Sequence, residues 1–95
     1  MGDLQWSEEL AISAERWAAQ CQVAHNSASD RKLSQFQPWV GQNMRFSTSD
    51  SSWVDSIAVW TEEKQNYQYG VGAVPANATV GHYTQIIWQN TTHVG

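Results

Sequence analysis

Six of the 95 residues are tryptophan, and this feature limits more than any other how the chain can fold. The six are spread along the chain: Trp6, Trp17, Trp39, Trp53, Trp60 and Trp88. Each carries a large apolar ring, so much of the apolar area depends on a few side chains. With 41% hydrophobic residues, the composition is that of a globular protein rather than a disordered one. A chain of this length forms one small domain at most, and its core is marginal without further support.

The charge pattern excludes two classes of partner. The net charge is −4, and the five Lys and Arg residues are scattered singly. Nucleic acid binding needs a clustered basic surface, and a polybasic membrane anchor needs the same, so we expect neither. No apolar run approaches the ~20 residues of a transmembrane helix, so we expect no transmembrane segment.

The clearest periodic segment runs from Ser7 to about Cys21. Leu10, Ala14, Trp17 and Cys21 recur at spacings of four, three and four, which is one face of an α-helix. Ser7 is suited to the N-cap, and the two glutamates that follow it favour the positive end of the helix dipole. The pattern therefore predicts a helix over this segment.

The rest of the chain predicts a second helix and two strands joined by long loops. The second helix is expected at residues 52–67, after a start signal rich in Ser and Asp. The expected loops are residues 25–39 and 70–81, and the expected strands are residues 40–46 and 83–88. The order is helix, strand, helix, strand, which predicts an α+β fold.

Four polar side chains lie where these expected elements end or turn: His25, Gln42, Glu63 and His82. Two imidazoles and a carboxylate can hold a divalent metal ion, and they can also transfer protons near neutral pH. Spacing alone leaves the alternative open that both histidines are structural and that Glu63 belongs to a solvated helix face. His93 lies in a polar tail, where we expect it to be exposed to solvent.

Four stretches carry a family resemblance: "LQWSEELAISAERWAAQCQVAHN", "VGQNM", "SWVDSIAVWTEEKQNYQY" and "GHYTQIIWQNTTHVG". Together they resemble the CAP superfamily, which includes the cysteine-rich secretory proteins, the antigen-five venom allergens and the class 1 pathogenesis-related proteins of plants. The last stretch resembles the signature block of the family. We expect it to form a signature strand that contains Gly81, Tyr83, Thr84, Gln85 and Trp88.

The resemblance implies a fold and a compartment. It implies an α-β-α sandwich, of which residues 1–95 are a single partial CAP domain that lacks the N-terminal helix and the C-terminal strands. Cys21 matches a cysteine that pairs with a partner downstream of the signature, so we expect a disulfide with a cysteine outside this chain. We therefore expect a secreted, extracellular protein. Glycosylation at the sequons of Asn77 and Asn90 would agree with secretion.

The resemblance also implies a site. The positions of His25, Gln42, Glu63 and His82 match four residues that line the central cleft of the family. Gln42 departs from the family pattern, which has a glutamate there, so one carboxylate is replaced by a neutral amide. We expect His25 and His82 to bind Zn²⁺ or another divalent cation, and Gln42 and Glu63 to support them.

Three functional hypotheses follow from the resemblance. The leading one is a secreted, non-enzymatic protein that binds a sterol, a fatty acid or an extracellular protein target. The second is a metal-assisted hydrolase that uses His25, Glu63 and His82, which the missing carboxylate at Gln42 disfavours. The third is a truncated product without an activity of its own.

Overall fold

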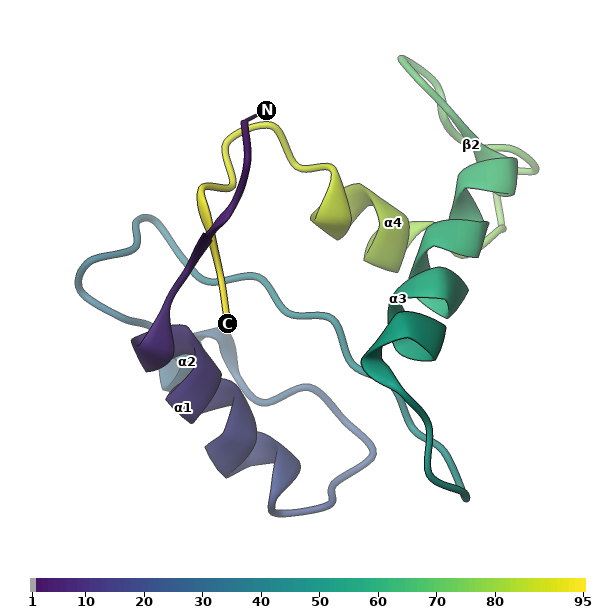
Figure 1. Ribbon diagram of the computed structural model, residues 1–95. Helices are drawn as coiled ribbons and strands as arrows, with labels where there is room; N and C mark the ends of the chain where they lie inside the picture. Colours follow the sequence, from purple (N-terminus) through teal and green to yellow (C-terminus); the bar gives the residue numbers. More distant parts are fainter. Residues whose placement is uncertain (1) are drawn as a thin grey trace. The chain divides into compact units, whose positions relative to one another are not determined.

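The computed structural model describes residues 2–95, which form two units: residues up to 44 together with 89–95, and residues 45–88. Each unit contains short helices and one pair of very short strands (Figure 1). This mixture agrees with the predicted α+β class.

The first unit contains the first helix that the sequence predicts. Helix α1 (Glu8–Ala18) starts at Ser7, whose hydroxyl accepts the backbone N–H of Leu10 at 3.2 Å and so caps the first turn. The helix ends three residues before the predicted boundary. Cys21 has a φ of 53° and an exposed thiol, so the predicted apolar stripe loses its last member.

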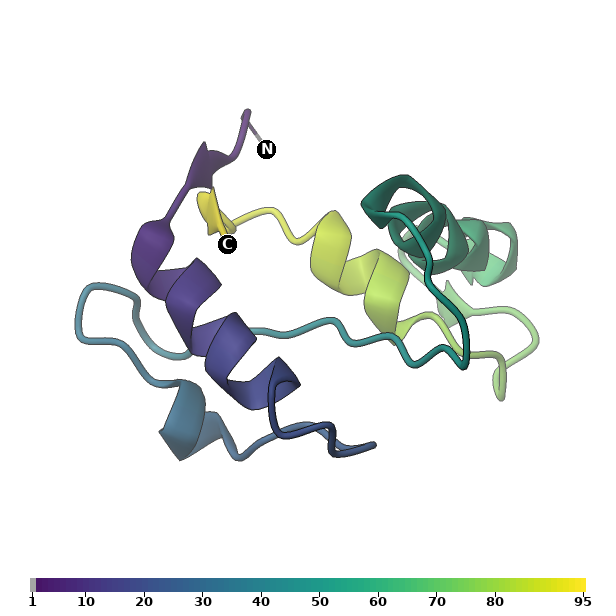
Figure 2. The same cartoon turned by 60° about the horizontal axis from the view of Figure 1, so that its bottom comes forward.

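A parallel strand pair, which the sequence pattern does not predict, lies beside the start of α1 (Figure 2). Strand β1 (Gln5–Trp6) pairs with β4 (His93–Val94), and the backbone N–H of Ser7 donates to Val94 O at 2.8 Å. Gly95 follows so close to α1 that a Cβ there would overlap the backbone oxygen of Ser7, so only glycine fits here without a backbone shift.

His93 is half-buried rather than exposed as predicted. Its ring lies 5.2 Å from that of Phe36, and its Nδ1 is 2.8 Å from the hydroxyl of Thr92. Its place in β4 brings it against the loop before residue 40, a contact between segments that are remote in sequence.

The segment between α1 and the end of the first unit differs from the prediction in two ways. The expected loop contains a single helical turn, α2 (Ala28–Arg31), which the hydroxyl of Ser27 caps. The strand expected at residues 40–46 is absent, and this prediction was wrong. One physical reason is that Val40 O accepts a hydrogen bond from Arg31 Nε at 3.1 Å, so a side chain takes the place of a neighbouring strand.

The second unit contains the other predicted helix, with nearly the predicted bounds. Helix α3 (Trp53–Glu62) begins at Ser52, whose hydroxyl accepts the backbone N–H of Asp55 at 3.0 Å. It continues as the tighter 3₁₀ turn η1 (Glu63–Asn66). The predicted helix over residues 52–67 is thus confirmed, and its last turn has 3₁₀ rather than α-helical geometry.

A small antiparallel hairpin follows, and its second strand lies in the segment 70–81, which was expected to be a loop. Strand β2 (Tyr67–Gln68) pairs with β3 (Gly72–Ala73), and the hairpin extends beyond the C-terminal end of α3 (Figure 1). Gly70 and Gly72 have φ values of 80° and 106°, which only glycine adopts readily, and they allow the tight reversal.

The signature segment is a helix, so the strand expected at residues 83–88 was wrong. Helix α4 (Gly81–Ile86) lies beside α3, as both cartoons show (Figures 1 and 2). Val80 at its N-cap offers no side-chain hydrogen bond. Instead, the carboxylate of Glu63 accepts the backbone N–H of Tyr83 at 3.0 Å, and this remote cap overrides the strand propensity of the sequence.

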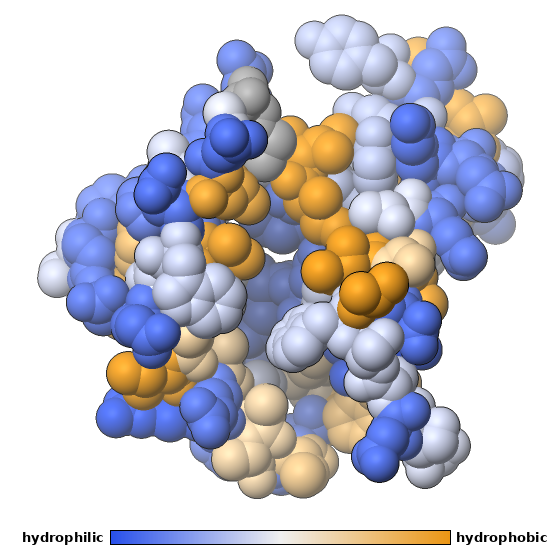
Figure 3. Space-filling view, in the orientation of Figure 1, coloured by the Kyte–Doolittle hydropathy of each residue, from blue (hydrophilic) through white to orange (hydrophobic). Residues whose placement is uncertain are grey.

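Apolar side chains in both units remain accessible to solvent (Figure 3). Among residues 2–95, Ser7 and Ser56 are the only buried residues, and no apolar residue is buried. The tryptophans therefore form no buried core in the part of the chain that the structure describes. Within the same residues, no helix has the length and hydrophobicity needed to span a membrane.

Candidate functional site

His25 and Gln42, two of the four predicted site residues, lie together in the first unit. His25 Nδ1 lies 2.6 Å from Gln42 Oε1. The residue before the histidine is fixed by α1, because the indole N–H of Trp17 donates to Ala24 O at 2.8 Å. The helix therefore positions the loop that carries His25.

The other end of the Gln42 amide is held by two residues that the sequence analysis did not identify. Gln42 Nε2 donates to Asn26 Oδ1 at 3.1 Å. The same oxygen accepts a hydrogen bond from a guanidinium nitrogen of Arg31, also at 3.1 Å. Asn26 follows His25 directly, and Arg31 ends α2. The signal in the sequence that could have located this turn is Ser27, which caps α2.

His82 and Glu63 form a second pair, in the second unit. His82 Nδ1 lies 2.7 Å from Glu63 Oε2, and the other carboxylate oxygen accepts the backbone N–H of Tyr83 at 3.0 Å. The ring of Trp60 stacks on that of His82, with centroids 6.0 Å apart and planes 14° from parallel. Side chains from α3 and η1 therefore hold this imidazole, which α4 carries, in one orientation.

The surroundings of Glu63 favour its ionised form. Burial by itself raises the pKa of this carboxyl. The hydrogen bonds from His82 and from the backbone N–H of Tyr83, together with the charge of His82, act in the opposite direction and hold its pKa below the ordinary value of 4.5. The Glu63 side chain is only 15% exposed, so these bonds are little screened by water.

The two pairs share one hydrogen-bonding arrangement of the imidazole ring. In each, the imidazole Nδ1 faces an oxygen, which leaves Nε2 as the nitrogen that can accept a hydrogen bond or bind a metal ion when the ring is neutral. Metal-binding histidines in proteins commonly use this arrangement, because an oxygen partner at the second nitrogen fixes the tautomer and the ring orientation.

The structure brings together His25 with Gln42 and Glu63 with His82, and the two pairs belong to different units. Within residues 2–95, no three His, Cys, Asp or Glu side chains are grouped so that they could hold a metal ion. The sequence analysis predicts only two protein ligands for the ion, His25 and His82. The absence of a group of three therefore does not test that prediction.

The remaining predicted residues have structural or exposed positions. Thr84 bonds within its own turn of α4, where its hydroxyl donates to Gly81 O at 3.1 Å. Gln85 lies in the last turn of the same helix, and Trp88 follows it with 60% of its surface exposed. The side chains expected to be modified are all exposed, namely Cys21, Asn77 and Asn90.

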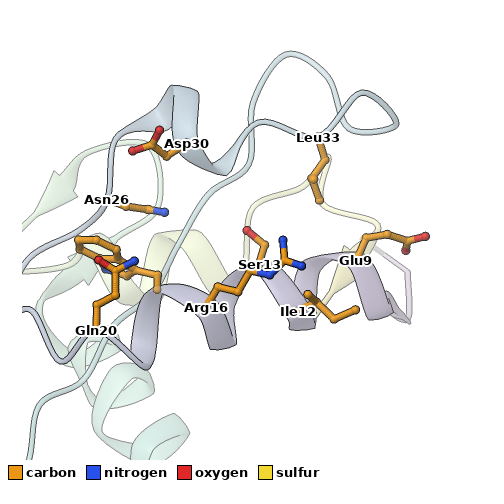
Figure 4. Close-up of a pocket in the computed structure, with 9 residues that line it drawn as sticks. Glu9, Ile12, Ser13, Arg16, Gln20, Asn26, Asp30 and Leu33 are labelled. Carbon is orange, nitrogen blue, oxygen red and sulfur yellow. The ribbon is translucent and has the colours of Figure 1, made fainter.

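A hollow of about 500 Å³ lies in the first unit between α1 and the segment that contains α2 (Figure 4). Its lining combines both signs of charge with apolar groups: Glu9, Ile12, Ser13, Arg16, Trp17, Gln20, Asn26, Asp30 and Leu33. Asn26 is the one residue that this hollow shares with the polar network around Gln42, so the hollow borders that network without containing the histidine.

Comparison with known proteins gives one consistent result. A family model described as "Cysteine-rich secretory protein family" matches residues 1–95. The chain is 41% identical over 92 residues to cysteine-rich secretory protein 2 of Cavia porcellus and 40% identical to cysteine-rich secretory protein 2 of Homo sapiens. It is 38% identical to cysteine-rich secretory protein 3 of Equus caballus. These matches cover 97% of this chain but only 36–37% of each relative, so the chain spans little more than a third of their length.

Proposed function

The chain belongs to the cysteine-rich secretory protein (CAP) family, and we propose that it is part of a secreted CAP-domain protein that acts by binding. The proposal includes the α-β-α sandwich of the family for the complete domain. It also includes an extracellular location, in which Cys21 forms a disulfide with a cysteine outside these 95 residues. The two exposed sequons support this location.

We propose further that His25 and His82 bind Zn²⁺ or another divalent cation, and that they do so weakly. The observation that supports this is that Nδ1 of each ring faces an oxygen at 2.6 or 2.7 Å, which favours Nε2 as the metal-binding atom. The pairing of the two histidines on one ion is inferred from the family resemblance. A bound Zn²⁺ could polarise a ligand oxygen.

The weakness of the binding follows from the residues that support the two histidines. Two imidazoles supply about half of a tetrahedral coordination shell, and water would complete it. Gln42 is neutral, so it orients His25 without adding negative charge. Binding should weaken in acid, because a protonated imidazole cannot bind a metal ion.

Calorimetric titration of the folded full-length protein with Zn²⁺ tests the proposal. We expect the double variant His25→Ala with His82→Ala to lose binding while keeping its fold. His93→Ala, which removes the third histidine of the chain, is the matched control and should bind as the unmodified protein does. Unchanged Zn²⁺ affinity in the double variant would mean that both histidines are structural.

The organic ligand or protein target is a separate part of the proposal. A sterol or a fatty acid would need an apolar contact surface, and the hairpin supplies Tyr67 and Tyr69, the latter 92% exposed. Binding of a fluorescent sterol or fatty acid to the full-length protein tests this part. The variant Tyr69→Ser should weaken that binding, whereas an unchanged affinity would favour a protein target or another surface.

One observation favours the second candidate, a metal-assisted hydrolase. The 2.7 Å contact between His82 and Glu63 is the relationship found between a catalytic base and the carboxylate that orients it. We regard this as the weaker candidate because Gln42 offers no second acidic group. Zn²⁺-dependent hydrolysis of peptide or ester substrates that is lost in His82→Ala would support it over the binding role.

A further inference from the structure

Arg31 is the one group in the polar network of the first unit whose hydrogen-bonding role is fixed by its chemistry. A guanidinium group is protonated at all ordinary pH values and can only donate. Arg31 Nε donates to Val40 O at 3.1 Å, and a terminal nitrogen donates to Asn26 Oδ1 at 3.1 Å and to Asn26 O. The side chain is half-buried, so these three bonds hold it in one position.

The direction of each further hydrogen bond in the network follows from that starting point. The atom of Asn26 that faces Arg31 must be the amide oxygen. The same oxygen lies 3.1 Å from the Gln42 side chain, so Gln42 must present its NH₂ group there. Gln42 then has its oxygen at the opposite end, 2.6 Å from His25 Nδ1, and that nitrogen must carry the hydrogen.

We propose that Arg31 and Asn26 are positioning residues that act through Gln42 to hold the neutral ring of His25 in the tautomer protonated on Nδ1. Its Nε2 is then the atom presented to a ligand. The use of Nε2 by a ligand rests on the proposed function, but the tautomer does not, since it exists in the protein without metal.

The role of Arg31 can be separated from simple packing because the two ends of an amide group have almost the same shape. If Asn26 and Gln42 both turned their amides over, the atoms would occupy nearly the same positions with the hydrogen-bond directions reversed. Gln42 would then present NH₂ to His25 and favour the tautomer protonated on Nε2. Only the obligate donor at Arg31 distinguishes the two patterns.

The tautomer of His25 can be read from the ¹⁵N chemical shifts of its ring in the metal-free, full-length protein labelled with ¹⁵N-histidine. The His25→Gln variant assigns the signals. We expect a single tautomer, protonated on Nδ1, in the unmodified protein. Arg31→Met should give a mixture of the two tautomers. Lys32→Met, which removes the same charge from the next residue, should leave the single tautomer unchanged.

A rescue variant provides the sharpest test. A carboxylate accepts at both oxygens, so Gln42→Glu in the Arg31→Met background should restore the tautomer protonated on Nδ1. Asn26→Ala breaks the same network one step later and should also give a mixture, which keeps the test available if Arg31→Met fails to fold. An unchanged tautomer in both Arg31→Met and Asn26→Ala, or no rescue by Gln42→Glu, would overturn the proposal. If the unmodified protein does not bind Zn²⁺, only the proposed metal site is overturned, and the proposed tautomer of His25 is not.

Discussion

Glu63 and Tyr83 are twenty residues apart, and a hydrogen bond of 3.0 Å joins the carboxylate of the first to the backbone N–H of the second. The other oxygen of the same carboxylate holds the ring of His82 at 2.7 Å. Glu63 therefore has two roles, because it caps α4 and orients the imidazole that α4 carries. The folding of this helix and the geometry of the candidate site depend on one side chain.

We predict that Glu63→Ala lowers the free energy of unfolding of the full-length protein by about 1–3 kcal/mol, since it removes a helix cap and a hydrogen bond to a charged group. Glu62→Ala, at the exposed neighbouring position, is the control and should have little effect. Denaturant unfolding followed by tryptophan fluorescence measures the difference. Equal effects of the two substitutions would show that the capping bond adds no stability.

The lowered pKa of Glu63 predicts a dependence of stability on pH. Because the pKa is lower in the folded protein than the ordinary value of 4.5, the unfolded chain binds more protons in this range. The stabilisation is therefore fully present above about pH 4.5 and is lost as the pH falls through the pKa of the folded state. Glu63→Gln should show a smaller loss of unfolding free energy between pH 6 and pH 3 than Glu62→Gln. An identical pH dependence in both variants would contradict this assignment.

The two longer helices could be predicted from local signals, and the signature segment could not. Ser7 and Ser52 both precede apolar periodic segments, and both cap the helices that follow. By contrast, Tyr83 and the two isoleucines after it have high strand propensity, and only a carboxylate from a distant helix end caps their segment as α4. A single-sequence pattern contains no information about such a partner. The β1–β4 pair was missed for the same reason, since it joins opposite ends of the chain.

For the candidate site, the sequence identified the residues but not the network that supports them. His25, Gln42, Glu63 and His82 were selected by their places at the ends of expected elements and then by the family resemblance, and the structure pairs them two by two. Asn26 and Arg31 were missed. Their contacts depend on the single turn α2, which has too few residues to produce a periodic signal.

Exposure of the large apolar side chains predicts that these 95 residues alone are poorly folded. No apolar side chain among residues 2–95 is fully buried, and Trp39 and Trp53 are 71% and 75% exposed. Hydrophobic burial is the main source of folding free energy, so little remains to offset the loss of chain entropy. We expect broad thermal unfolding and poorly dispersed amide NMR signals. A sharp, cooperative transition in this fragment would refute the prediction.

Asn77 and Asn90 should be glycosylated when the full-length protein is secreted from animal cells. Both side chains are exposed, and Asn77 lies in the loop that follows the β2–β3 hairpin. Asn77→Gln and Asn90→Gln should each reduce the mass by one glycan, and the double variant should be insensitive to glycosidase treatment. Secretion of the unmodified protein with no mass change on that treatment would count against both sites.

The last prediction concerns Gln42, at the position where the family resemblance implies a glutamate. Gln42→Glu should raise Zn²⁺ affinity, because it adds a negative charge next to His25. It should also lower the free energy of unfolding by about 1 kcal/mol, because a carboxylate cannot donate to Asn26 Oδ1 and two acceptors would face each other at 3.1 Å. In the Asn26→Ala background this destabilisation should largely disappear.

A double-mutant cycle measured by denaturant unfolding gives the coupling between the two positions, and calorimetry gives the Zn²⁺ affinity. Zero coupling would mean that Asn26 does not determine which residue is tolerated at position 42. An unchanged Zn²⁺ affinity would mean that a negative charge at position 42 does not strengthen metal binding.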